Sequence, residues 1–182
     1  MKKPKTNLGT MKQKALILVD LEKEWVNKDS DYFIGDVSSL IDKTNLLISY
    51  CRKNDYKIIF TRHIELDSQV EFSKDSENIE ILDEINRKSS DIIIEKNKIS
   101  PFYQTNLEDE LKGVEQIVIC GILTNLCVRS LVEGAYDRDF AITIITDCCQ
   151  AFDKETHNFT LKDLKETREE IILSSLAKFT KE

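Results

Sequence analysis

Short, continuous apolar runs alternate along this chain with longer segments whose apolar residues recur at helical spacing. The continuous runs are typical of buried strands, which we expect at 15–20, 56–61, 91–96, 116–121, 140–147 and 170–174. The periodic segments predict helices at 36–54, 79–85, 106–112, 124–138 and 154–167. Two stretches with little pattern, 21–35 and 63–78, are expected to be loops.

This order of elements predicts an α/β protein. Strands that alternate with helices form mostly parallel sheets, and strands without polar alternation are covered on both faces. We therefore expect a Rossmann-like three-layer sandwich, with about six mostly parallel strands and helices on both faces. No repeat, linker or break in composition divides residues 15–182, which predicts a single domain after a flexible, basic and polar tail at 1–14.

Composition and charge narrow the range of partners. A net charge of −7 disfavours nucleic acid and anionic membranes as partners. The five cysteines are an odd number with no framework of spacings, which is typical of a reducing, cytoplasmic location. The run Ala15–Val19 is too short for a signal peptide or a membrane span. The two histidines are far apart in the sequence, so no Cys/His zinc site is expected.

Reactive side chains follow several of the predicted strands. In a parallel sheet, chemistry collects just beyond the carboxyl ends of the strands. Asp20 follows one apolar run directly, and a carboxylate there is costly unless it is paired or used. A helix cap or a surface turn would explain Asp20 equally well. Lys96 follows another run, although a solvated lysine would suit that position and Lys98 is an equal choice on this ground.

Cys127 is the best candidate nucleophile among the cysteines. If Thr124 caps the following helix, Cys127 lies in its first turn, where free N–H groups and the helix dipole favour a thiolate. The competing interpretation is a small buried apolar residue, because the helix is apolar over a wide arc and free cysteines are commonly buried.

A cysteine nucleophile needs a base. The histidines His63 and His157 are the obvious choices, and His63 follows a strand end where it could contact a ligand. If neither serves, a carboxylate must take the proton of the thiol. Asp20 would then be the base, and Lys96 would stabilise the thiolate.

Three segments of the sequence, spread from about Ala15 to Ser175, resemble one family. They are ALILVDLEKEW, EKNKISPFYQTNLEDEL and CGILTNLCVRSLVEGAYDRDFAITIITDCCQAFD. Together they resemble the isochorismatase-like cysteine hydrolases, which include nicotinamidases, N-carbamoylsarcosine amidases, ureidoacrylate amidases and isochorismatases. The register of the second segment selects Lys96 rather than Lys98.

The resemblance implies a mechanism and a set of residues. Cys127 would attack a small amide or a related C–N bond and form a thioester, Asp20 would carry the proton, and Lys96 would stabilise the charges. It also implies a cis peptide between Ile122 and Leu123, with the N–H groups of Leu123 and Cys127 facing the oxyanion.

The resemblance further implies a substrate pocket and an assembly. The pocket would include Trp25, His63, Phe102 and Thr124. Members of the family are commonly dimers or larger, so we expect a homo-oligomer.

Three positions depart from the nicotinamidase pattern. Nicotinamidases hold a metal after the second strand, but here His63 replaces the aspartate of that pattern and Glu65 stands near a histidine position. We therefore expect neither a metal nor another cofactor, and no nicotinamidase activity. Glu22 replaces a common glutamine, and it would either select a cationic substrate or face away.

Other functions remain open at this stage. The segment LILVDLE also resembles the nucleophile strand of haloacid-dehalogenase-type phosphatases, but Glu22 stands where that chemistry needs a second aspartate. A vinyl-ether hydrolase of the isochorismatase type and a catalytically silent family member are the remaining alternatives. The sequence does not name the substrate.

Overall fold

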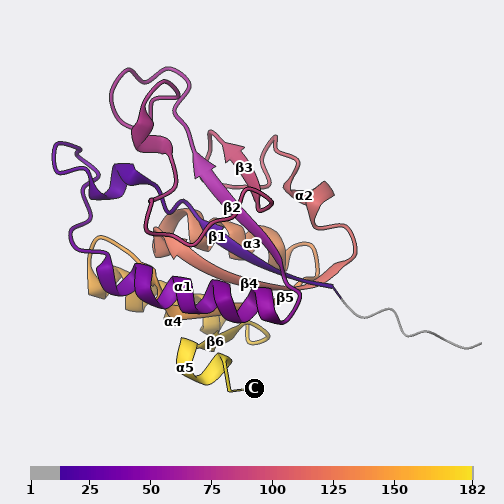
Figure 1. Ribbon diagram of the computed structural model, residues 1–182. Helices are drawn as coiled ribbons and strands as arrows, with labels where there is room; N and C mark the ends of the chain where they lie inside the picture. The colour runs from indigo at the N-terminus through magenta and orange to yellow at the C-terminus, as the bar shows by residue number, and fades with distance from the viewer. Residues whose placement is uncertain (1–12, 182) are drawn as a thin grey trace, which may run out of the picture.

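The computed structural model describes residues 13–181, and its centre is a sheet of six parallel strands in the order β3-β2-β1-β4-β5-β6 (Figure 1). The strands are β1 Gln13–Val19, β2 Lys57–His63, β3 Ile92–Lys96, β4 Val114–Ile122, β5 Ala141–Gln150 and β6 Ile172–Ser174. This sheet confirms the predicted α/β class and the predicted number of strands.

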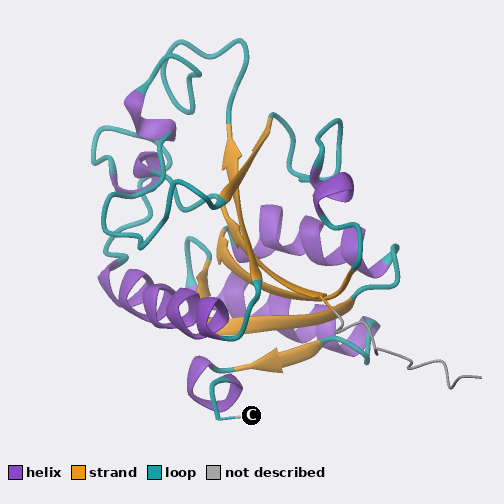
Figure 2. Ribbon diagram, turned by 45° about the vertical axis from the view of Figure 1, so that its right-hand side comes forward, coloured by secondary structure: helices purple, strands orange, loops and turns teal. Residues whose placement is uncertain are grey.

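Helices cover both faces of the sheet, as predicted. Figure 2 shows α1 on one side of the sheet and α3 on the other. The α-helices are α1 Ser38–Lys53, α2 Leu107–Glu110, α3 Arg129–Tyr136, α4 Lys154–Thr167 and α5 Leu176–Phe179. Three short helical segments complete the set: η1 Lys23–Val26, η2 Glu77–Ile79 and the π-helical η3 Thr124–Val128. In the described part of the chain, no helix has the length and apolar character to cross a bilayer.

The central strands β1 and β4 approach each other very closely at their carboxyl ends. Gly121 pairs with Val19 and has a φ of +128°, in the region that favours glycine. A Cβ atom built on Gly121 would lie 2.1 Å from the carbonyl oxygen of Val19. Only glycine allows this approach, which brings the residue after β1, Asp20, next to the segment that follows β4.

The prediction of a helix at 79–85 is wrong. That segment contains the end of η2 and an isolated antiparallel bridge between Ile81 and Glu22. The N–H of Leu82 donates to the carbonyl of Leu21, and the carbonyl of Glu80 accepts from Lys23. The backbone of residues 80–82 therefore pairs with the 21–23 segment and does not form a helix. Figure 1 shows η1 and η2 together beyond the carboxyl ends of β1 and β2.

Several predicted boundaries differ from the structure. The helix predicted at 124–138 consists of η3 followed by α3, and β5 extends to Gln150, beyond the predicted end at 147. The helix α5 has no predicted counterpart. Residues 1–12 of the predicted tail lie outside the described residues, whereas Gln13 and Lys14 belong to β1 rather than to a tail.

Candidate active site

The three residues of the predicted triad come from three different strand ends. Asp20 directly follows β1, Lys96 is the last residue of β3, and Cys127 lies in η3 just after β4. Because all strands are parallel, these ends share one edge of the sheet. Asp20 has a φ of +51°, a left-handed conformation that aspartate tolerates better than most residues.

The ammonium group of Lys96 contacts the other side chains of this site. Its Nζ lies 2.7 Å from Oδ2 of Asp20, 3.3 Å from Sγ of Cys127 and 3.2 Å from Nδ1 of His63. An ammonium has three hydrogens, so each acceptor can take one of them. The side chains of Lys96 and Asp20 are both fully buried. Burial alone would lower the pKa of Lys96, but the negative charge of Asp20, together with the hydrogen bonds to Asp20 and Cys127, outweighs it and raises that pKa.

Asp20 is held rigidly on both its side chain and its backbone. Its Oδ1 accepts a hydrogen bond from the hydroxyl of Thr61 at 2.5 Å, while Oδ2 faces Lys96. The backbone N–H of Asp20 donates to the carbonyl of Thr61, and the indole Nε1 of Trp25 donates to the carbonyl of Asp20 at 2.7 Å. The carboxylate is therefore oriented before any substrate arrives.

Cys127 differs from the low-pKa thiol that its predicted position favours. Burial first, and then the negative charge of Asp20, raise the pKa of Cys127 above its ordinary value, and Lys96 only partly opposes them. The expected N-cap is also different. Leu123 occupies the N-cap position, and the hydroxyl of Thr124 pairs with Nδ1 of His157 at 2.8 Å. The resting residue is therefore a thiol that needs a base.

The two histidines have different places. His63 lies between Lys96 and Glu65, with its Nε2 2.8 Å from Oε1 of Glu65. Since Nδ1 faces an ammonium and Nε2 faces a carboxylate, the neutral tautomer with hydrogen on Nε2 fits both partners. His157 belongs to α4 and bonds to Thr124. Among the described residues, neither histidine hydrogen-bonds to the sulfur of Cys127.

A cavity of about 270 Å³ opens over Cys127, and we call it the strand-end cavity. Its polar lining consists of Asp20, His63, Glu65, Asn97, Lys98 and Cys127. Its apolar lining consists of Trp25, Tyr32, Phe72, Ile99, Leu123, Leu126 and Phe152.

The aromatic rings form one wall of the strand-end cavity. Trp25 makes edge-to-face contacts with Tyr32, Phe72 and Phe152, at centroid distances of 6.0, 5.2 and 6.2 Å. Tyr32 and Phe72 come from the loops predicted at 21–35 and 63–78, which sequence reasoning could not fold. The sequence predicted the two loops, but no pattern in it indicated that Tyr32 and Phe72 would line the cavity.

The structure places two of the four predicted pocket residues on the strand-end cavity. Trp25 and His63 line it, whereas Phe102 and Thr124 do not. Phe102 instead lies under the guanidinium of Arg138, whose Cζ is 4.2 Å from the ring centre, and Thr124 is turned toward His157. The peptide bond between Ile122 and Leu123 is cis, and the side chain of Leu123 lines the strand-end cavity.

The residues beside this cavity do not fit a metal centre of the nicotinamidase kind. His63 and Glu65 occupy that region, but both ring nitrogens of His63 already have partners in Lys96 and Glu65. Within residues 13–181, no group of three histidine, cysteine, aspartate or glutamate side chains is arranged to hold an ion. The lysine occupies the position next to His63 Nδ1 that a cation would need.

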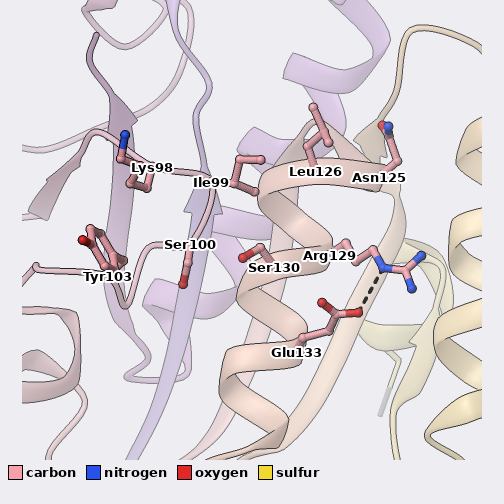
Figure 3. A pocket seen from close by; sticks show the side chains of 9 residues that line it. All are labelled: Lys98, Ile99, Ser100, Tyr103, Asn125, Leu126, Arg129, Ser130 and Glu133. Atoms are coloured by element: carbon pink, nitrogen blue, oxygen red, sulfur yellow. Dashed lines mark hydrogen bonds and ion pairs between the residues drawn. The ribbon is translucent and has the colours of Figure 1, made fainter. Parts of the chain in front are cut away.

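A shallow groove of about 690 Å³ adjoins the strand-end cavity (Figure 3). Lys98, Ile99 and Leu126 line both hollows, whereas Cys127 lines the strand-end cavity alone. Figure 3 shows the loop side chains of Ile99 and Ser100 facing the helix that carries Leu126 and Ser130.

Known proteins share both the sequence pattern and the fold. A family model described as the isochorismatase domain matches residues 14–175. Nicotinamidase 3 of Arabidopsis thaliana is 26% identical over 168 residues, which span 82% of this chain and 79% of that protein. An isochorismatase-like hydrolase from Alkaliphilus metalliredigens matches with a TM-score of 0.83 and 19% identity, over 93% of this chain and 98% of that one. The pyrazinamidase of Pyrococcus horikoshii, solved in complex with zinc, matches with a TM-score of 0.79 and 20% identity, over 90% of this chain and 99% of that one. Since the family model spans most of its length, the chain belongs to the isochorismatase family of hydrolases.

Proposed function

We propose that this protein is a cysteine amidohydrolase that cleaves a small amide or a related C–N bond through a thioester. The observation that carries the proposal is the position of the buried Lys96, which contacts both Asp20 and Cys127, two residues that line the strand-end cavity. A buried acid, a buried cation and a partly exposed thiol in mutual contact supply a base, a charge stabiliser and a nucleophile.

The first half of the reaction forms the thioester. Sγ of Cys127 attacks the carbonyl carbon of the amide, and the proton of the thiol passes to the carboxylate of Asp20. The oxyanion of the tetrahedral intermediate faces the backbone N–H groups of Leu123 and Cys127. Loss of one such donor typically costs about 10²–10³ in rate. When the C–N bond breaks, the leaving nitrogen takes the proton from Asp20.

The second half of the reaction restores the enzyme. A water molecule attacks the thioester carbon and gives one proton to Asp20. The carbon–sulfur bond then breaks, the acid product leaves, and the sulfur of Cys127 recovers its proton from Asp20. Lys96 stays protonated throughout, because the charges around it raise its pKa, and it balances whichever partner is negative.

The shape of the strand-end cavity favours a small, planar substrate. Its volume of about 270 Å³ is near the lower end of ligand pockets, and aromatic rings form one wall. Relatives named for nicotinamide and pyrazinamide hydrolysis support an amide as the reacting group. In this chain, His63 and Glu65 fill the region beside the triad, and both ring nitrogens of His63 have partners in Lys96 and Glu65, so we propose an amidase that works without a metal.

A hydrolysis screen tests this function. The wild-type protein is incubated with small carboxamides, ureido compounds and nicotinamide, and release of the amine or ammonia is measured. We expect Cys127→Ala to abolish hydrolysis and Cys51→Ala, at a buried thiol in α1, to keep it. Mass spectrometry should find an acyl group on Cys127. Hydrolysis that survives Cys127→Ala, or iodoacetamide that labels Cys127 no faster than Cys51, would overturn the proposal.

A further inference from the structure

Glu22 is a buried acid beneath the active site that the proposed reaction does not use. It lies two residues after Asp20, and it is completely buried. Its Oε1 accepts a hydrogen bond from the backbone N–H of His63 at 2.6 Å. Its Oε2 is also buried and has no hydrogen-bond partner among the described residues. An ionised carboxylate at this place would carry its charge into the interior with one N–H as compensation, which is costly.

The cations near Glu22 form their ion pairs with other acids. Lys96 directs its three hydrogens to Asp20, His63 and Cys127. Arg62 bonds through its two terminal nitrogens to Glu80 and Glu95, and its Nε is buried without a partner among the described residues. The remaining charged neighbour is Asp20, which repels a second negative charge.

The net effect of these surroundings favours the neutral form of Glu22. Burial, followed by the negative charge of Asp20, raises the pKa of Glu22 well above its usual value. The hydrogen bond from His63 and the charges of Lys96 and Arg62 lower that pKa by less. The neutral acid also leaves one hydroxyl hydrogen unpaired, which is a smaller cost than an unpaired charge.

We propose that Glu22 is a positioning residue in the form of a neutral carboxylic acid, which holds the backbone of His63 and leaves Asp20 as the single negative carboxylate beneath Lys96. Because His63 in turn accepts from Lys96, Glu22 acts on the triad through His63. The inference rests on the proposed function for its catalytic consequence. The protonation state of Glu22 can be tested without any substrate.

Glu22→Gln is the matched variant, because an amide keeps the acceptor for the N–H of His63 and cannot ionise. If Glu22 is neutral in the folded protein, the unfolded chain releases its proton near the usual glutamate pKa of about 4.3, while the folded protein keeps it. The wild type therefore loses stability relative to Glu22→Gln as the pH rises above about 4 and up to the folded pKa. We expect equal urea midpoints near pH 4 and a higher midpoint for Glu22→Gln at pH 8.

Three measurements decide the inference. The first is the difference in urea midpoint between wild type and Glu22→Gln across that pH range, with Glu24→Gln, at another buried glutamate in the same segment, as the control. The second is infrared difference spectroscopy at neutral pH, where the wild type should show the band of a protonated carboxyl that Glu22→Gln lacks. The third is the rate at which iodoacetamide labels Cys127. This rate should fall about tenfold in Glu22→Leu, which loses the hydrogen bond to His63, and should recover in Glu22→Gln, which keeps it.

The outcomes separate this inference from the proposed function. A midpoint difference that does not change with pH, or a missing infrared band, overturns the neutral acid. Equal labelling rates in Glu22→Leu and Glu22→Gln overturn the positioning role. A wild-type Cys127 that reacts no faster than Cys51 overturns the proposed function and the positioning role together, while the urea and infrared results still decide whether Glu22 is neutral.

Discussion

Nδ1 of His63 lies 3.2 Å from Nζ of Lys96 and takes the hydrogen that Asp20 and Cys127 leave free. This contact adds β2, which carries His63 as its last residue, to the strand ends that build the site. It also sets the direction of the ammonium group, because a lysine with three fixed acceptors cannot rotate toward solvent. A residue expected to contact ligand therefore also holds the cation of the triad in place.

Replacing His63 with leucine should slow the enzyme through Lys96. One hydrogen bond to a charged group is worth about 1.5–3 kcal/mol, so we expect kcat/KM to fall about ten- to hundredfold. His63→Asn places an amide oxygen near the position of Nδ1 and should recover part of the loss. The measurement is kcat/KM on the best amide from the screen. Equal losses in the leucine and asparagine variants would contradict a role as hydrogen-bond acceptor.

Replacing Lys96 with methionine should destabilise the fold as well as remove activity. The change keeps most of the side-chain volume but leaves the fully buried carboxylate of Asp20 without its cation. Breaking a buried ion pair in this way costs about 3–5 kcal/mol, measured as the free energy of unfolding in urea. The exposed Lys98→Met is the control and should change stability by less than about 0.5 kcal/mol. Adding Asp20→Asn to Lys96→Met should restore part of the loss, and a further decrease would argue against this explanation.

His157 should make the protein sensitive to acid. Burial lowers the pKa of His157 in the folded state, so the neutral form is favoured there and its nitrogen can accept from Thr124. The resulting stability is present above the unfolded pKa of about 6.5 and is lost as the pH falls through the lower, folded value. Urea midpoints of wild type and His157→Asn should therefore diverge at neutral pH and converge in acid. Parallel curves at all pH values would refute this prediction.

Gly121→Ala should prevent normal pairing of β1 and β4. The new Cβ would lie 2.1 Å from the carbonyl oxygen of Val19, in backbone that cannot move without breaking the sheet. We expect a loss of more than about 4 kcal/mol or failure to fold. Gly113→Ala is the control, since that glycine also has a positive φ but its nearest atom, in the side chain of Gln13, is 3.9 Å away. The control should lose only about 1–2 kcal/mol from the left-handed conformation. Circular dichroism and urea unfolding measure both variants.

Much of the fold was predictable because buried parallel strands appear in a sequence as unbroken apolar runs. The same property located Asp20, which directly follows the run in β1, whereas the runs alone left Lys96 and Lys98 as equal choices and the family resemblance selected Lys96. The structure places Lys96 in contact with both Asp20 and Cys127. The prediction of a helix at 79–85 was wrong for a physical reason. The isoleucines and leucine of this segment pack on the core while its backbone pairs with residues 21–23, and a helical spacing cannot reveal that long-range partner.

The finer properties of the site depend on burial and on contacts between distant segments. The pKa of Cys127 is raised because the thiol is buried beside Asp20, whereas its place near a helix start suggested the opposite. Tyr32 and Phe72 make edge-to-face contacts with Trp25 from two loops without any periodic pattern. Contacts of this kind join segments that are far apart in the sequence, and they form only when the chain has folded.

The order of the strands has a consequence for a chain that is still being synthesised. β4 carries the link to Cys127, and it lies in the centre of the sheet between β1 and β5 although it follows β3 in the sequence. Until β4 pairs with β1, Cys127 has neither Asp20 nor Lys96 beside it and is an ordinary thiol. The rate at which an electrophile labels Cys127 should therefore change, during refolding, when β4 pairs with β1.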